Sequence, residues 1–165
     1  MAWSGRSVDR AASRLLYVGL CIVVLWSGSA LINYSLVVKL YKDYLLKWEV
    51  AAERYRDSGL QWPVFNGANH TDYMGALVGQ MRKAGIQVPR SNTTAPYTYV
   101  LDHLWGKDER IFVLVLPEKI IIYGLSIRTF EKVDSYVDGV VDMKRGKLVG
   151  RIGRDGQTVV AIWGR

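Results

Sequence analysis

The sequence predicts an α+β protein: one long N-terminal helix, made of a transmembrane span and a stalk, followed by a small domain with a mainly antiparallel sheet and two packed helices. Three observations lead to this class. Residues 15–38 contain no charged side chain, helical apolar spacing continues beyond them, and residues 97–163 alternate β-branched runs with turn dipeptides. The charge-free segment excludes an ordinary soluble cytosolic enzyme.

The N-terminal third divides into a short basic tail, residues 1–14, and an apolar segment, residues 15–38. As a helix, this segment would be roughly 36 Å long, enough to cross a bilayer. A secretory signal cleaved near Ala30 is the alternative, since Gly28 and Ser29 are also small. Apolar residues resume after Ala30 and continue to Val38, which favours an uncleaved anchor. Cys21, the only cysteine, lies inside the segment and excludes an intramolecular disulfide.

The orientation of this single-pass anchor depends on the charges that flank it. Residues 1–14 and residues 39–53 each carry three Lys or Arg, so the positive-inside rule discriminates little. The free amine and the short polar tail favour a cytoplasmic N-terminus. We therefore expect the C-terminal domain to be extracytoplasmic.

Residues 39–58 are predicted to form an amphipathic, coiled-coil-like stalk. Apolar residues recur there at alternating spacings of four and three, with no Pro or Gly between them. This heptad seam comprises Tyr34, Val38, Tyr41, Leu45, Trp48, Ala52 and Tyr55. The seam is predicted to pack against helices of other membrane proteins, in a homo- or hetero-oligomer. The alternative is that it packs on the chain's own domain.

Residues 59–165 are predicted to form the α+β domain. A helix is expected over residues 72–84 and another from Ile127 to about residue 138, each followed by a glycine. Strands are expected at residues 97–101, 111–116, 119–123, 140–143, 147–152 and 157–163. Pro117-Glu118 and Asp155-Gly156 supply turns between consecutive strands.

Residues typical of catalysis are sparse, and we expect a protein that is not an enzyme, with no catalytic residue, metal or cofactor. The two histidines, His70 and His103, are isolated from each other and from the only cysteine. Neither a phosphate-binding loop nor a dinucleotide fingerprint is present. Asp134, Asp138 and Asp142 recur every four residues and could bind a cation, although a solvated edge is the favoured interpretation.

The C-terminal segment carries most of the net charge of +7. Its cations Lys144, Arg145, Lys147, Arg151 and Arg154 could contact an anionic lipid surface or an acidic partner. The alternative is that they protect the edges of terminal strands from pairing with other chains. Nucleic acid is not an expected partner, because no aromatic stacking platform is interleaved with these cations.

Aromatic residues gather around the expected loops of the domain: Trp62, Phe65, Tyr97, Tyr99 and Trp105. They could line a ligand pocket, which would indicate a membrane-anchored ligand-binding or sensory domain. They could equally cover the open face of the sheet.

The order of short tail, single span, stalk and small α+β domain resembles the bitopic scaffold subunits of bacterial pilus and secretion machines. This resemblance is one of architecture, and it implies a structural or assembly subunit of a multi-protein envelope complex. The alternatives are the sensory domain and a pilin-like or pseudopilin-like filament subunit. Pilins carry an early Glu in their apolar helix, and residues 15–38 contain none.

Overall fold

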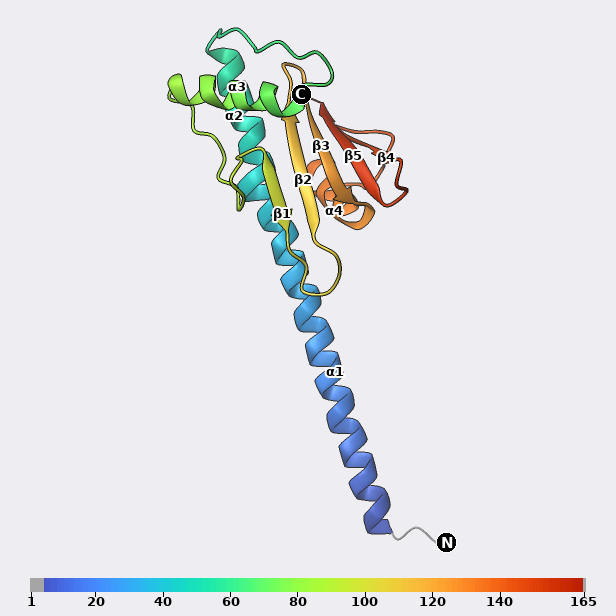
Figure 1. The fold of residues 1–165 in the computed structure, drawn as a ribbon. Helices are drawn as coiled ribbons and strands as arrows, with labels where there is room; N and C mark the ends of the chain where they lie inside the picture. Colours follow the sequence, from blue (N-terminus) through green and yellow to red (C-terminus); the bar gives the residue numbers. More distant parts are fainter. Residues whose placement is uncertain (1–4, 165) are drawn as a thin grey trace. The chain divides into compact units, whose positions relative to one another are not determined.

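A computed structural model describes residues 5–164, with side chains described from residue 9 onward. Residues 1–4 of the expected tail therefore lie outside the described residues. The elements are α1 (Gly5–Lys39), η1 (Leu40–Leu45), α2 (Leu46–Asp57), α3 (His70–Lys83), β1 (Thr98–Leu101), β2 (Glu109–Val115), β3 (Lys119–Ser126), α4 (Ile127–Val137), β4 (Leu148–Ile152) and β5 (Thr158–Gly164) (Figure 1). The α+β class is confirmed.

The chain forms two compact units, of which the first ends at Ser35 and the second begins at Leu36. Residues 15–35, most of the apolar segment of α1, lie in the first unit and are largely exposed: the exposed fraction is 74 % for the side chain of Leu15 and 73 % for that of Trp26. The helix is long and apolar enough to span a membrane. The segment expected as a separate stalk belongs to the second unit and to its core.

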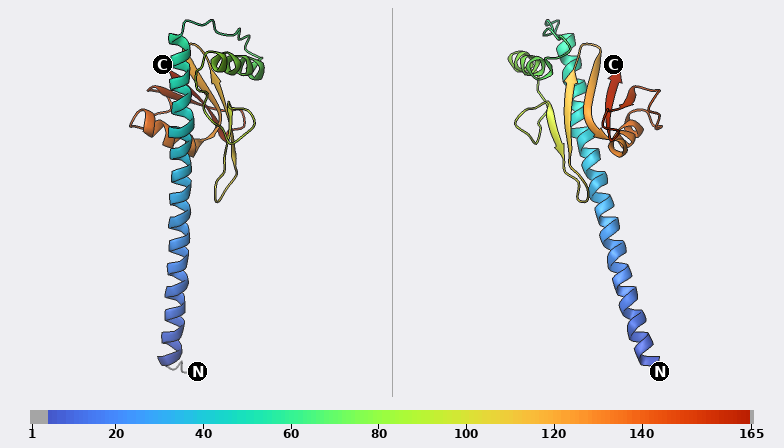
Figure 2. Two further views of the ribbon diagram at one scale, coloured as in Figure 1. Left: turned by 90° about the vertical axis from the view of Figure 1, so that its left-hand side faces the viewer. Right: turned by 45° about the vertical axis from the view of Figure 1, so that its right-hand side comes forward.

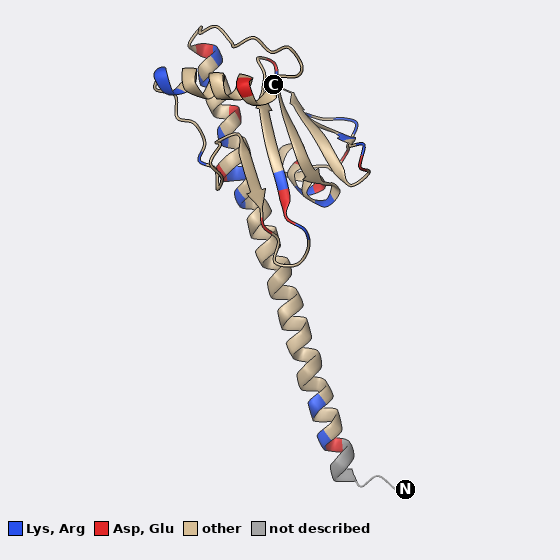
Figure 3. Cartoon of the chain, viewed as in Figure 1, with Lys and Arg blue, Asp and Glu red and all other residues tan. Residues whose placement is uncertain are grey.

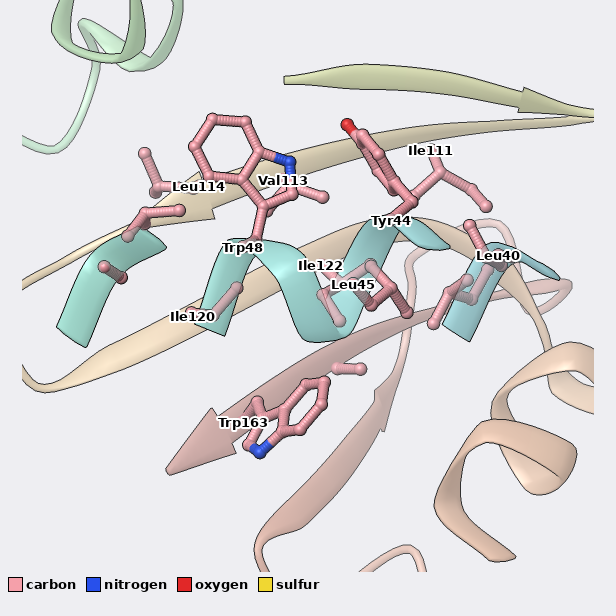
Figure 4. Close-up of a cluster of buried hydrophobic side chains, with 14 of the residues drawn as sticks. Leu40, Tyr44, Leu45, Trp48, Ile111, Val113, Leu114, Ile120, Ile122 and Trp163 are labelled. Carbon is pink, nitrogen blue, oxygen red and sulfur yellow. The ribbon is translucent and has the colours of Figure 1, made fainter. Parts of the chain in front are cut away.

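The second unit is built on a five-stranded sheet in the order β1-β2-β3-β5-β4, with every neighbouring pair antiparallel. One face, which we call the core face, carries Val113, Ile122 and Ala161 at directly opposed positions. The helix η1–α2 packs on this face through Tyr44, Leu45 and Trp48 (Figure 4). Alternation along the strands places most of their buried side chains on the core face.

Helices α3 and α4 lie on opposite sides of the sheet (Figure 2). Phe130 of α4 covers Gly150 of β4 on the core face, where a Cβ atom would stand 2.8 Å from the phenyl ring. On the other face, His70 at the start of α3 packs edge-on against Phe112 and Tyr123. The two helices expected at residues 72–84 and 127–138 are thus confirmed.

The long helix contains a π-helical turn, η1, which the sequence did not predict. The backbone N–H of Leu46 donates to the carbonyl of Tyr41, five residues back, so the turn holds one residue more than an α-turn. One buried stripe, Val37, Leu40 and Tyr44, runs from α1 into η1, and a second, Leu45, Trp48, Ala52 and Tyr55, runs from the last residue of η1 into α2. The extra residue brings both stripes onto the same face of the helix.

The strand expected at residues 140–143 does not form. Two aspartates at the C-terminal end of α4 accept hydrogen bonds from the backbone of this segment: Asp134 accepts from the N–H of Asp142, and Asp138, the C-cap residue, accepts from the N–H groups of Lys147 and Leu148. Residues 138–147 therefore form turns, and pairing with β5 begins at Leu148. The prediction was wrong because carboxylate acceptors compete with the sheet for backbone donors.

Candidate functional site

The structure places most of the predicted heptad seam inside the chain's own domain. Leu45, Trp48, Ala52 and Tyr55 are buried, Val38 and Tyr41 are half-buried, and Tyr34 lies in the first unit with half of its surface exposed. Tyr41 stacks on Trp163 with ring centroids 6.2 Å apart. Because the chain's own domain already covers these side chains, self-packing is the alternative that the structure supports. Packing of Tyr34 on a partner helix stays a prediction.

The three aspartates of the predicted acidic set connect α4 to the segment before β4. Asp134 is fully buried, and burial raises the pKa of its carboxyl; the charge of Asp138 raises it too, whereas the hydrogen bond from Asp142 lowers it. Burial alone would raise the pKa of the Asp138 carboxyl, but the hydrogen bonds from the backbone N–H groups of Leu148 and Lys147 outweigh this effect, so its pKa is lowered. The three carboxylates thus accept hydrogen bonds from backbone N–H groups between α4 and β4.

Replacing Asp134 with Asn is expected to stabilise the protein at neutral pH, by about 3 °C in Tm. A carboxyl whose pKa is raised by folding contributes stability at low pH, and this contribution is lost as the pH rises through the folded-state pKa. The amide removes the cost of a buried charge and keeps the acceptor for Asp142. Thermal unfolding of the full chain in detergent at pH 7 and pH 4 measures the difference, which should shrink at pH 4.

The control for this prediction is Asp138→Asn, which is expected to lower the Tm at neutral pH. Its carboxylate accepts two backbone hydrogen bonds of 2.9 Å and its pKa is lowered, so its contribution is present at neutral pH and lost on acidification. Equal Tm changes for the two variants at pH 7 would contradict the assignment.

A second buried polar cluster centres on Glu109 at the start of β2. One carboxylate oxygen is 2.8 Å from Nε2 of His103 and accepts a 2.7 Å hydrogen bond from the Thr129 hydroxyl. The other oxygen accepts from the backbone N–H of Ser126, the N-cap residue of α4. Glu109 thus connects His103 of the β1–β2 loop to the start of α4. Among residues 5–164, no group of three or more His, Cys, Asp or Glu side chains could hold a metal ion.

The five loop aromatics do not assemble into a pocket. Trp62 packs on Tyr55, Phe65 on Tyr73 and Tyr99 on Tyr44, each with ring centroids about 5 Å apart. Tyr97 lies against Phe112, and Trp105 is 75 % exposed. A shallow hollow of about 390 Å³ lies elsewhere, between α2 and residues 87–90, and is lined by the cations Lys47, Arg54 and Arg90. It contains none of these aromatics.

The face of the sheet opposite the core face, which we call the open face, is apolar and only partly covered. The strand registers set Leu114, Ile121, Ile162 and Val149 in one row across four strands. Helix α3 buries Leu114, while Ile121, Ile162 and Val149 remain half-buried. Two further pairs lie on this face: Phe112 of β2 opposite Tyr123 of β3, and Val160 of β5 opposite Arg151 of β4. Among residues 5–164, no helix packs over β5 and β4 on this face.

Cations surround this apolar surface. By strand alternation, Arg110, Lys119, Lys147 and Arg151 share the open face with Val149 and Ile121, and all four are exposed. Lys144 and Arg145 precede β4, and Arg154 lies in the turn that follows it (Figure 3). Since β4 is an edge strand, its cations are also at positions where charge prevents the strand from pairing with strands of other chains.

Sequence reasoning found Lys147 and Arg151 but missed the apolar surface beside them. Residues 111–116 and 119–123 are continuous apolar runs, in which both faces of the strand look alike. The available signal was charge: Arg110, Lys119 and Arg151 interrupt their strands at positions that share one face. No known protein family matches this chain, and neither does any curated protein or solved structure.

Proposed function

We propose that this protein is a single-span, membrane-anchored structural or assembly subunit of a multi-protein envelope complex, and that it binds an acidic, apolar segment of a partner on the open face. The observation that carries the proposal is the combination of half-buried Ile121, Ile162 and Val149 with a rim of exposed cations. Burying the apolar side chains of such a sheet face against a partner lowers the free energy of the complex. The cations would select partners with carboxylates around their apolar contacts.

The second support is the path of the main helix. One helix carries the apolar segment and continues to Asp57, and its last part forms the core of the domain. A membrane anchor that is also a core element suits a subunit that holds a binding face near a bilayer. We propose a cytoplasmic N-terminus and an extracytoplasmic domain, with the apolar segment free to pack against other membrane helices.

A photo-crosslinking amino acid at Ile162 tests the proposal in native membranes. We expect a crosslinked species larger than the 18.7 kDa chain, and strong loss of this species when Lys119→Glu and Arg151→Glu are combined. Both cations lie on the open face, away from the Asp138 contacts. The matched control combines Lys83→Glu with Arg128→Glu, which changes the net charge equally at exposed positions on α3 and α4.

Two results would overturn the proposal: no crosslink from Ile162, or equal loss in both charge-reversal variants. The mass of the product separates the candidates. A ladder at multiples of the chain mass would favour the filament subunit, whose supporting feature is the long apolar helix that leads onto an antiparallel sheet. A single heavier species would favour assembly with a different protein.

A further inference from the structure

The loop between β1 and β2, residues 102–108, exposes two large apolar side chains at its tip. Trp105 is 75 % exposed and Leu104 is 51 % exposed. Gly106 follows with a φ of +130°, a conformation that allows the chain to turn immediately after the tryptophan. Exposing a tryptophan in water at a loop tip is costly, because its indole ring is one of the largest apolar surfaces in a protein.

The base of this loop is fixed by the Glu109 cluster. His103, which precedes the tip, is bonded to Glu109 at 2.8 Å, and Glu109 is in turn bonded to Thr129 and Ser126. The buried cluster thus holds both ends of the loop against the start of α4. This arrangement presents Leu104 and Trp105 together from a supported base.

The loop lies at the end of the second unit where the chain enters it. The helix and strand β2 run in the same direction here. Figure 4 shows Leu40, Tyr44 and Trp48 in the same order along the helix as Ile111, Val113 and Leu114 along β2. Tyr44 contacts Tyr99, which pairs with Ile111. The last pair of β1 and β2, Leu101 with Glu109, lies two residues further, about 7 Å along the strand.

The same distance along the helix, at about 1.5 Å per residue, leads from Tyr44 back to Leu40 or Lys39. Residues 102–108 continue past this level, beyond the ends of β1 and β2 (Figure 1). They therefore reach the level of residues 36–38, the last charge-free residues before Lys39. In a membrane-anchored chain, this is where hydrocarbon gives way to head groups.

We propose that the tip of the β1–β2 loop inserts Leu104 and Trp105 into the interfacial region of the bilayer that holds the N-terminal helix. This inference rests on the proposed membrane anchor. The chemistry fits: tryptophan is the residue most suited to the head-group boundary, where its ring is in acyl chains and its N–H meets water. The flanking Asp102, Lys107 and Asp108 remain with the head groups and limit the depth of insertion.

A fluorescent depth measurement on the full chain tests this inference. In a Cys21→Ser background, Trp105→Cys is labelled with a polarity-sensitive probe and the protein is reconstituted into phosphatidylcholine vesicles. The vesicles carry a quencher on the acyl chain near the glycerol backbone. The matched control is Val64→Cys, another exposed apolar loop position (82 %), in the segment that follows the far end of α2.

We expect quenching at position 105 to be at least about twofold stronger than at position 64, with a shift of emission to shorter wavelength, because the loop tip would lie about 5–10 Å into the interface. A second variant excludes insertion driven by the probe itself. With the probe at Leu104→Cys, adding Trp105→Glu should abolish the quenching.

The outcomes separate this inference from the proposal that it rests on. Protein that does not float with the vesicles would overturn the membrane anchor and the inference together. Protein that floats but gives equal quenching at positions 105 and 64 would overturn the loop insertion alone, and would leave the anchor and the open face as proposed.

Discussion

Replacing Trp48 with Ala is expected to destabilise the domain by about 3–5 kcal/mol, the usual cost of truncating a large buried aromatic residue. Trp48 is fully buried and lies between the helix and the core face, with the Tyr44 ring packed edge-on at 6.5 Å. Such a loss is a large part of the total stability of a small domain. Thermal or denaturant unfolding of the full chain in detergent, followed by near-ultraviolet circular dichroism, measures it.

The control is Val50→Ala on the same helix, where the side chain is 41 % exposed and a change below about 0.5 kcal/mol is expected. The comparison also decides what the heptad seam does. If Trp48 were a contact for a partner helix and not a core residue, the isolated protein would unfold at the same temperature with either residue. An unchanged Tm for Trp48→Ala would therefore contradict the self-packed arrangement.

Replacing Gly124 with Ala is expected to cost about 3 kcal/mol or more, for two independent reasons. The residue has a φ of +85°, in the region that L side chains disfavour. A Cβ atom there would also collide with the backbone carbonyl of Arg110 on the neighbouring strand, whose carbon would be 3.1 Å away. Backbone cannot move aside without breaking the β2–β3 pairing next to the irregularity between Ile122 and Leu125.

Gly75→Ala is the matched control for that substitution. Gly75 lies inside α3, nothing stands within 4 Å of the position of its Cβ, and its φ is not positive. Alanine there should leave the protein equally or more stable, because it raises helix propensity and restricts the unfolded chain. Similar Tm values for the two alanine variants would show that Gly124 is not constrained as the structure implies.

Most predictions that depended on local pattern were confirmed; the strand expected at residues 140–143 is the exception. The charge-free segment, the glycine-terminated helices after residues 72 and 127, and the strands around Pro117 each have a signal within about 15 residues, and each is present. At Val38 and Tyr41 the predicted seam is one residue out of phase with the buried stripe, which holds Val37 and Leu40, because the π-turn shifts the phase of the helix by one residue.

Long-range features could not be read from one sequence. Nothing in residues 158–164 indicates that they pair with β3 as well as with β4, since strand order depends on contacts between distant segments. The candidate site shows the same limit. Arg151 and Lys119 are 32 positions apart in the chain, and only the register of three strands shows that they share a face with Ile162. The sequence predicts the cations, but it does not predict the apolar surface between them.

The position of β5 between β3 and β4 determines when the sheet can close during synthesis of the chain. The strand follows the other four strands in the sequence and is therefore synthesised after them, yet it lies between β3 and β4 and supplies the buried residues Val159, Ala161 and Trp163. Until it is synthesised, β3 has a free edge and β4 has no partner. The apolar segment of α1 precedes every strand in the sequence, so any insertion into a membrane can precede closure of the sheet. A nascent chain that stalls before Thr158 would therefore expose an unpaired, aggregation-prone strand to the quality-control machinery of the cell.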